Sequence, residues 1–210
     1  MHASASPRRR LFLALAGGGF AFAAFCRPCA VLAQPAPASA SALVKSAGER
    51  LVAVINAPGT IQDKQPRLVQ IIESAVDVDG VAKFCLGRFW RSATPDQQKQ
   101  YTTLFHTVLV NNITSKLGEY QGATFSVVQV QTREETAIVA TTVERPGNPL
   151  TKVDWVVSDE SGAPKVVDLI AEGTSLRLTQ RSDYAAYLSR NSNNIQALIN
   201  AMRQQLAANG

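Results

Sequence analysis

The chain has few of the side chains on which most nucleophilic and metal chemistry depends: three cysteines and two histidines among 210 residues. All of these except Cys85 and His106 lie in the first 33 residues, so the following 177 residues keep one of each. An internal disulfide needs two cysteines, and a structural metal site usually needs four ligands of these types. The chain also lacks the G-x-S-x-G, H-E-x-x-H and glycine-rich phosphate-loop motifs. These absences argue against the common hydrolase, metalloprotease and nucleotide-binding sites.

The first segment has the layout of an export signal. Arginines at positions 8–10 precede an apolar run from Leu11 to Phe25, and small residues lead up to Ala33. The run is too short and glycine-rich for a stable membrane span, so we expect residues 1–33 to be a signal peptide cleaved near Ala33. The arginine pair fits either the Sec or the twin-arginine route. Residues 34–42 are rich in Ala, Pro and Ser and are expected to be a flexible lead-in to one domain, residues 43–210.

Removal of the signal changes the charge of the chain. Residues 1–33 contain four arginines and no acidic residue, so the net charge falls from +5 to +1. No basic block remains, and this excludes the electrostatic footprint of a nucleic-acid-binding protein.

Helical patterns occupy the first part of the domain. Apolar residues at four-residue steps predict a helix from Leu43 to Ile55, and Pro66 is expected to open a second helix. A short helical piece passes through Cys85. The strongest local pattern is Thr94-Pro95-Asp96-Gln97, a capping box with proline at the first helical position. It begins a predicted helix of about 24 residues with one apolar stripe.

From Thr124 the pattern changes to β-branched runs separated by short polar turns. Four strands are predicted, at Phe125–Gln131, Thr136–Glu144, Thr151–Ser158 and Pro164–Ile170. The short turns favour an antiparallel meander, and Gly173 is expected to close the sheet. Two further helices end the chain, the second beginning near Ser192. Helices, then antiparallel strands, then helices predict an α+β fold.

Several stretches resemble, in order and spacing, the MlaC family of periplasmic phospholipid-shuttle proteins, also called toluene-tolerance auxiliary proteins. They are Val76-Asp77-Val78, Leu86-Gly87-Arg88-Phe89-Trp90, Thr94-Pro95, the helix Tyr101–Tyr120, Val167-Asp168-Leu169, Glu172–Leu176, Arg181–Tyr184 and the helix Ile195–Leu206. The chain departs from the family near Val76 and Val78 and near Asn112 and Ile113. These departures leave the subfamily open, including the hopanoid-linked relatives called HpnM.

The resemblance implies a twisted antiparallel sheet packed by N- and C-terminal helices around an apolar cavity for lipid acyl chains. It implies a monomeric, non-enzymatic periplasmic carrier without a cofactor, which moves phospholipid between the outer and inner membranes and maintains outer-membrane lipid asymmetry. The implied partners are an inner-membrane ABC transporter complex and an outer-membrane lipoprotein–porin complex.

A two-tailed lipid carries on the order of thirty methylenes, and exposing them to water costs roughly 20 kcal/mol or more. A carrier must therefore enclose the tails, and we expect a sleeve between the long helix and the sheet. The candidate lipid-binding residues are the large apolar side chains of these elements and their neighbours: Phe89, Trp90, Leu104, Phe105, Val108, Val139, Trp155, Val157, Leu169 and Leu188. Ordinary core packing is the alternative explanation for each of them.

Two other classes of function remain open at this point. A cavity enzyme of isomerase or hydrolase type would need Asp154, Asp168 or His106 buried in the cavity with a shifted pKa. A periplasmic adaptor or chaperone would need a filled interior and an exposed apolar patch. Arg88 and Arg91, next to Phe89 and Trp90, either attract phosphate or are solvated charges.

Overall fold

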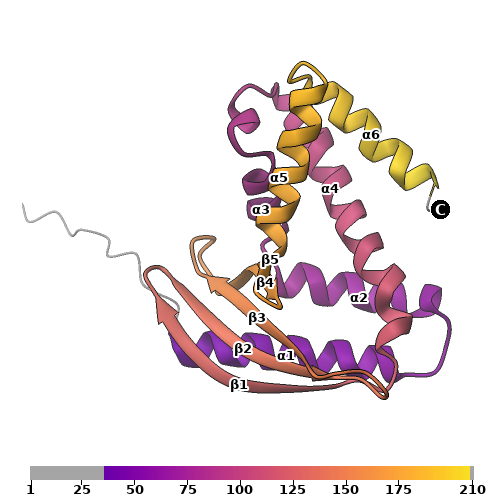
Figure 1. Ribbon diagram of the computed structural model, residues 1–210, viewed down its shortest axis with the longest axis vertical. Coiled ribbons are helices and arrows are strands. Elements are labelled where there is room, and N and C mark those ends of the chain that lie inside the picture. The colour runs from indigo at the N-terminus through magenta and orange to yellow at the C-terminus, as the bar shows by residue number, and fades with distance from the viewer. Residues whose placement is uncertain (1–35, 209–210) are drawn as a thin grey trace, which may run out of the picture. The chain divides into compact units, whose positions relative to one another are not determined.

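The structure is a computed structural model that describes residues 36–208, and it confirms the α+β prediction (Figure 1). Its helices are α1 (Pro37–Asn56), α2 (Ile61–Ala75), α3 (Val78–Leu86), α4 (Pro95–Lys116), α5 (Leu176–Arg190) and α6 (Ile195–Ala208), with 3-10 turns η1 (Gly87–Arg91) and η2 (Leu117–Tyr120). Its strands are β1 (Thr124–Arg133), β2 (Thr136–Glu144), β3 (Thr151–Ser158), β4 (Lys165–Ala171) and β5 (Thr174–Ser175). The predicted signal peptide lies outside the described residues.

The capping box predicted before α4 is present. The Gln97 backbone N–H donates to Thr94 Oγ1 at 3.2 Å, and the Thr94 N–H donates to Gln97 Oε1 at 3.1 Å. These two bonds satisfy donors that the first turn of a helix leaves without partners. The helix they begin has 22 residues, close to the predicted length.

Two helix starts differ from the prediction. The α1 helix begins at Pro37, within the segment expected to be a flexible lead-in, because Ala40 on its first turns is fully buried against the sheet. The α2 helix begins after Thr60 rather than at Pro66, because Thr60 and Asp63 form a second capping box. Pro66 lies inside α2, where it removes one backbone hydrogen bond without ending the helix.

The five strands form one antiparallel meander in the order β1-β2-β3-β4-β5. The strand β5 was not predicted. It pairs with the end of β4 through a two-residue turn in which Glu172 and Gly173 both have positive φ, 50° and 82°. Positive φ at both central positions gives the turn the twist that a tight hairpin requires.

Apolar side chains gather in three clusters rather than one core. The helical cluster joins α3, η1, α4, α5 and α6, and its buried members include Phe105 and Leu188. The sheet cluster joins α1 to the strands through Val44, Val139 and Val157. A third, the α1–α2 cluster, contains Val54 and Leu68.

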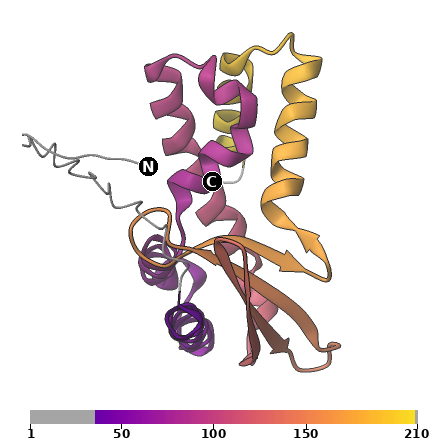
Figure 2. The ribbon, with the colours of Figure 1, turned by 90° about the vertical axis from the view of Figure 1, so that its left-hand side faces the viewer.

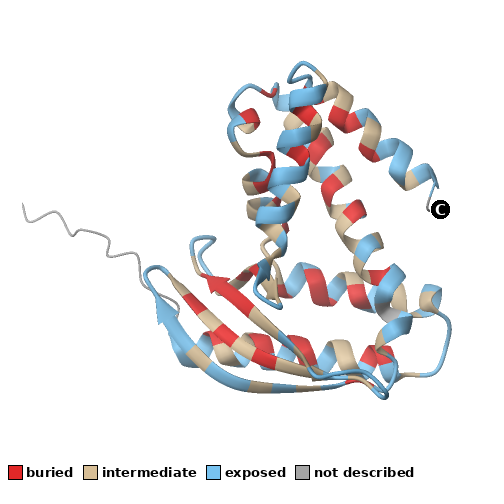
Figure 3. Cartoon of the chain, viewed as in Figure 1, coloured by how far each residue is buried: buried red, intermediate tan, exposed pale blue. Residues whose placement is uncertain are grey.

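The helix that covers the sheet is α1, and this corrects the predicted packing of the long helix on the strands. Figure 2 shows α1, in indigo, beside one face of the sheet, where it contacts β1 and β2. The long helix α4 packs mainly against α2, α3 and α6. Figure 3 shows the result: burial is concentrated in β2 and β3, whereas β1 is largely exposed. No helix within residues 36–208 combines the length and apolar character of a membrane span.

Candidate functional site

The ten candidate lipid-binding residues fall into two of the three clusters. The helical cluster holds six of them: Phe89, Trp90, Leu104, Phe105, Val108 and Leu188. The sheet cluster holds the other four: Val139, Trp155, Val157 and Leu169. The structure therefore does not bring all ten into a single site.

The candidate residues also differ in how much of their surface is exposed. Val139, Val157 and Leu188 have no exposed surface, so in this conformation they contact only protein. Trp90, Leu104 and Leu169 are partly exposed, and Trp155 keeps 9% of its surface exposed.

The sheet residues form a continuous apolar row across four strands. In the register of the sheet, Val130 pairs with Val139, Val139 with Trp155, and Trp155 with Leu169. Residues paired across strands share one face of a sheet. This row is the wall that the strands offer to the interior of the protein.

Hydrogen bonds fix the polar edge of Trp155 within this wall. Its indole Nε1 donates to Thr141 Oγ1 at 3.0 Å, and Thr141 Oγ1 in turn donates to the Val153 carbonyl at 2.7 Å. The ring of Phe125 meets the Trp155 ring edge-on, with centroids 6.1 Å apart. The buried donor is thus satisfied, and the indole presents only apolar surface to its other neighbours.

Leu51 on α1 occupies an unusual position for a partly exposed side chain. Its neighbours one turn away in both directions, Ala47, Gly48, Val54 and Ile55, are all buried. Residues at these spacings lie on the same face of a helix, so Leu51 is at the centre of the buried face of α1. It is nevertheless partly exposed, so solvent reaches part of its apolar surface even though the residues around it on this face are buried.

The three clusters contact one another through apolar side chains that, like Leu51, are partly exposed. Val76 packs against both the helical and sheet clusters, Ile113 against the helical and α1–α2 clusters, and Leu43 and Leu51 against the sheet and α1–α2 clusters. All four are only partly buried. We call Leu43, Leu51, Val76 and Ile113 the junction, because the clusters contact one another through them.

The sequence analysis missed the junction as a site, although its pattern contained three of its members. Leu43, Leu51 and Ile113 belong to the apolar stripes that predicted their helices. Their spacing predicted that these side chains pack in the core. Spacing alone does not show whether other side chains cover an apolar helix face completely or only in part.

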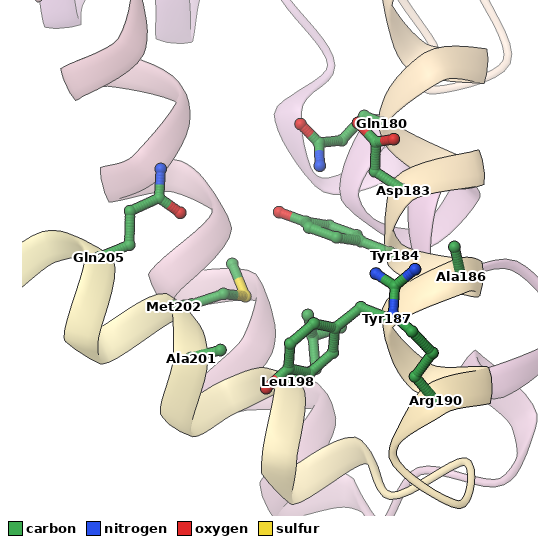
Figure 4. A pocket seen from close by; sticks show the side chains of 10 residues that line it. All are labelled: Gln180, Asp183, Tyr184, Ala186, Tyr187, Arg190, Leu198, Ala201, Met202 and Gln205. Carbon is green, nitrogen blue, oxygen red and sulfur yellow. The ribbon is translucent and has the colours of Figure 1, made fainter.

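A separate pocket lies between α5 and α6. It has a volume of about 390 Å³, and none of the ten candidate residues lines it. Figure 4 shows Tyr184 and Met202 projecting toward it from the two helices, with Gln180 and Asp183 toward one end and Arg190 toward the other.

Comparison with known proteins identifies the fold and the family. A family model described as MlaC protein matches residues 45–204. The chain belongs to the MlaC family. This is a family of non-enzymatic, periplasmic lipid-binding carriers. Among solved structures, the chain is similar to a phospholipid-binding protein from Ralstonia solanacearum, determined in complex with a phospholipid. The TM-score is 0.73 at 24% identity, over 81% of this chain and 98% of that one, so the two share a fold.

Cys85, and His106 and Asp168 from the catalytic candidates, contact other protein groups in this MlaC family member. Burial raises the pKa of the Cys85 thiol to about 12, and its Sγ lies 3.6 Å from the Arg177 carbonyl. His106 Nε2 lies 2.9 Å from Asp79 Oδ1, and the side chains of His106 and Asp79 are 36% and 76% exposed. Within residues 36–208 no three His, Cys, Asp or Glu side chains are grouped to hold a metal ion.

The two strand carboxylates do not form a pair. Asp154 lies opposite Ala140 and Ile170, whereas Asp168 lies opposite Val156. The buried Asp168 accepts hydrogen bonds from Ser175 Oγ at 2.5 Å and from the Leu169 and Arg177 backbone N–H groups at 2.8 and 3.0 Å. Its oxygens thus hold the start of α5 against β4.

Proposed function

We propose that this protein is a phospholipid carrier that encloses acyl tails at the junction of its three apolar clusters. The observation that carries the proposal is the partial exposure of Leu51 at the centre of the buried face of α1. Membership of the MlaC family and the fold shared with a phospholipid-bound protein support it.

The energetics of tail burial favour an interior site over a surface groove. About thirty methylenes at ~0.8 kcal/mol each require enclosure on most sides. The clusters are joined at the junction by side-chain packing among partly exposed residues. Tails that enter there cover apolar surface that is already accessible, so less packing is lost than if a closed core were opened.

The proposal gives the candidate residues different roles. Trp155 and Leu169 contact the tails from the sheet, and Leu51 and Ile113 contact them from α1 and α4. Leu104, Phe105 and Val108 support the helical side of the site. The remaining candidates, Phe89, Trp90, Val139, Val157 and Leu188, pack behind these walls.

We infer the cellular role by analogy with the family, whose members are periplasmic lipid-binding carriers. After cleavage of residues 1–33 the protein acts in the periplasm and moves phospholipid between the outer and inner membranes. It exchanges lipid with an inner-membrane ABC transporter complex and an outer-membrane lipoprotein–porin complex, and so maintains outer-membrane lipid asymmetry.

Mass spectrometry of lipid extracted from the purified protein tests the proposal. We expect phospholipid from the parent protein and a several-fold lower amount from Leu51→Trp, whose larger side chain occupies the space beside α1. Ile113→Trp is expected to act in the same way from α4. Val128→Trp is the control, because Val128 is 65% exposed on β1.

Circular dichroism establishes that each variant is folded before its lipid is measured. Recovery of a hopanoid, or of no lipid at all, from the parent protein would contradict the proposed cargo. Equal phospholipid in the folded Leu51→Trp and Val128→Trp proteins would contradict the proposed location.

A further inference from the structure

One surface of the helical region is cationic, and the two chain segments that form it contain no acidic residues. Residues 80–95 and 173–182 contain five lysines and arginines and no aspartate or glutamate. The first segment covers most of α3, all of η1 and the first residue of α4, and the second covers the beginning of α5. The helices α3 and α5 pack side by side, so the two segments meet on the folded protein.

Aromatic rings hold these cations in place. The guanidinium carbons of Arg177 and Arg181 lie 4.4 and 4.8 Å from the centroid of the Phe84 ring. Arg88 lies over the ring of Phe89 at 4.8 Å, and Lys83 Nζ is 6.0 Å from the Trp90 ring. Stacking of this kind restrains a cation while its N–H donors stay free for a ligand. We call Lys83, Arg88, Arg177 and Arg181 the cationic face.

Gly87 contributes to this arrangement. Its φ is +59°, and a Cβ at this position would lie 3.2–3.3 Å from the Arg181 guanidinium. Glycine therefore satisfies the backbone turn between α3 and η1 and also leaves room for Arg181 next to Phe84.

Three of the four cations have no ion pair within residues 36–208: Lys83, Arg88 and Arg181, all of them exposed. Arg177 Nε is 3.5 Å from Asp168 Oδ2, which compensates its charge. Among the described residues, none of the acidic groups that border the two segments forms an ion pair with Lys83, Arg88 or Arg181. Asp79 contacts His106, Asp96 accepts a hydrogen bond from Gln100, and Asp183 lines the α5–α6 pocket. The face therefore offers positive charge to an external anion.

Exposed apolar side chains flank the same surface. Leu178 is 56% exposed and Leu176 is 49% exposed, and neither belongs to an apolar cluster. They lie two positions apart on α5 and so point to different sides of the helix, which does not form a groove for a peptide. Cations interleaved with exposed leucines and a partly exposed tryptophan are typical of protein surfaces that lie on lipid headgroups.

We propose that the cationic face, with Leu178, rests on the surface of an anionic lipid bilayer. Lys83, Arg88 and Arg181 bind lipid phosphates, and Leu178 enters the boundary between the headgroups and the acyl chains. This goes beyond tail binding, since it assigns the protein a contact with the membrane itself during lipid exchange.

Sedimentation with lipid vesicles tests this assignment. We expect the protein to bind vesicles of phosphatidylcholine mixed with phosphatidylglycerol, to bind phosphatidylcholine alone far more weakly, and to be released by salt. Each cation at an anionic surface contributes about fivefold in affinity, so Lys83→Gln/Arg88→Gln/Arg181→Gln is expected to weaken binding roughly 100-fold.

The matched control is Arg67→Gln/Lys99→Gln/Lys116→Gln, which removes the same charge from exposed residues without ion pairs elsewhere in residues 36–208. It is expected to change affinity much less. Because Arg181 packs on Phe84, Lys83→Gln/Arg88→Gln provides a second variant with roughly 25-fold weaker binding. Leu178→Ser is expected to weaken binding without a change in charge.

Equal binding to the two vesicle types, or equal losses in the test and control triple variants, would overturn the proposal. So would capture of an acidic protein by this face without vesicle binding. The amount of phospholipid bound to Lys83→Gln/Arg88→Gln/Arg181→Gln distinguishes membrane contact from tail binding. We expect this amount to equal that of the parent protein, because the three cations do not contact the tails. A protein that binds anionic vesicles but carries no lipid would contradict only the carrier proposal.

Discussion

Helix α1 approaches β1 so closely that the side chain at position 48 decides whether they fit. Gly48 is buried, and a Cβ there would lie 2.4 Å from Phe125 Cε1 and 2.5 Å from Cζ. These distances are far below van der Waals contact, so in Gly48→Ala the Phe125 ring has to move. We predict that Gly48→Ala destabilises the protein, although alanine is the better helix former.

The magnitude follows from opposing contributions. Replacing an interior helical glycine by alanine gains ~0.5–1 kcal/mol. Overpacking costs ~1–3 kcal/mol, and displacement of Phe125 from its edge-on contact with Trp155 costs a further ~0.5–1.5 kcal/mol. The net loss is about 0.5–4 kcal/mol, and each kcal/mol lowers Tm by roughly 2–4 °C in a protein of this size.

Urea denaturation of the parent protein, Gly48→Ala and Gly118→Ala measures this loss. Gly118 is the control, because a Cβ there meets no atom within 4 Å. In a Phe125→Leu background the smaller side chain removes the clash, so Gly48→Ala is expected to cost little or to stabilise. A Gly48→Ala protein as stable as the parent, or one whose loss persists in the Phe125→Leu background, would refute the reasoning.

Two further predictions concern buried groups. Thr141→Val leaves Trp155 Nε1 without its hydrogen-bond acceptor, and we expect urea denaturation to show a loss of about 1–3 kcal/mol in the free energy of unfolding. The control is Thr142→Val, on the other face of β2, which is expected to lose little. Equal losses of stability in the two variants would contradict the proposed hydrogen-bond role. The pKa of Cys85 is raised in the folded protein from 9.0 to about 12, so the unfolded state loses this proton first and stability is expected to fall as pH rises from 9 toward 12. Cys85→Ser should reduce the contribution, and the same alkaline loss in that variant would show that other groups cause it.

Local chemistry accounts for most of the secondary structure that was predicted correctly. The capping box at Thr94 and Gln97 depends on residues three positions apart, and the strands β2 and β3 have the predicted bounds because alternation and turn residues mark both ends. The start of α2 was predicted wrongly, although Thr60 and Asp63 carry an equally local cap. Proline was given more weight than the cap there, yet Pro66 is tolerated within the helix.

The candidate site was only partly accessible from the sequence. The sheet residues Val139, Trp155 and Leu169 were predicted as separate candidates, and the register places them in one row. The pattern did not reveal that six other candidates belong to a separate cluster. The cluster to which a residue belongs depends on contacts between residues far apart in the chain. The apolar periodicity of a single helix carries no information about these contacts.

The sequence by itself determined the α+β class, the order of the elements and the apolar face of each one, because these depend on propensities and spacings within about twenty residues. The tertiary structure alone decided that α1 rather than α4 covers the sheet, and that Leu51 stays partly exposed at the centre of a buried face. Whether an apolar face is filled depends on the volumes of side chains contributed by several distant elements. These volumes come together only when the helices and strands pack in the folded protein.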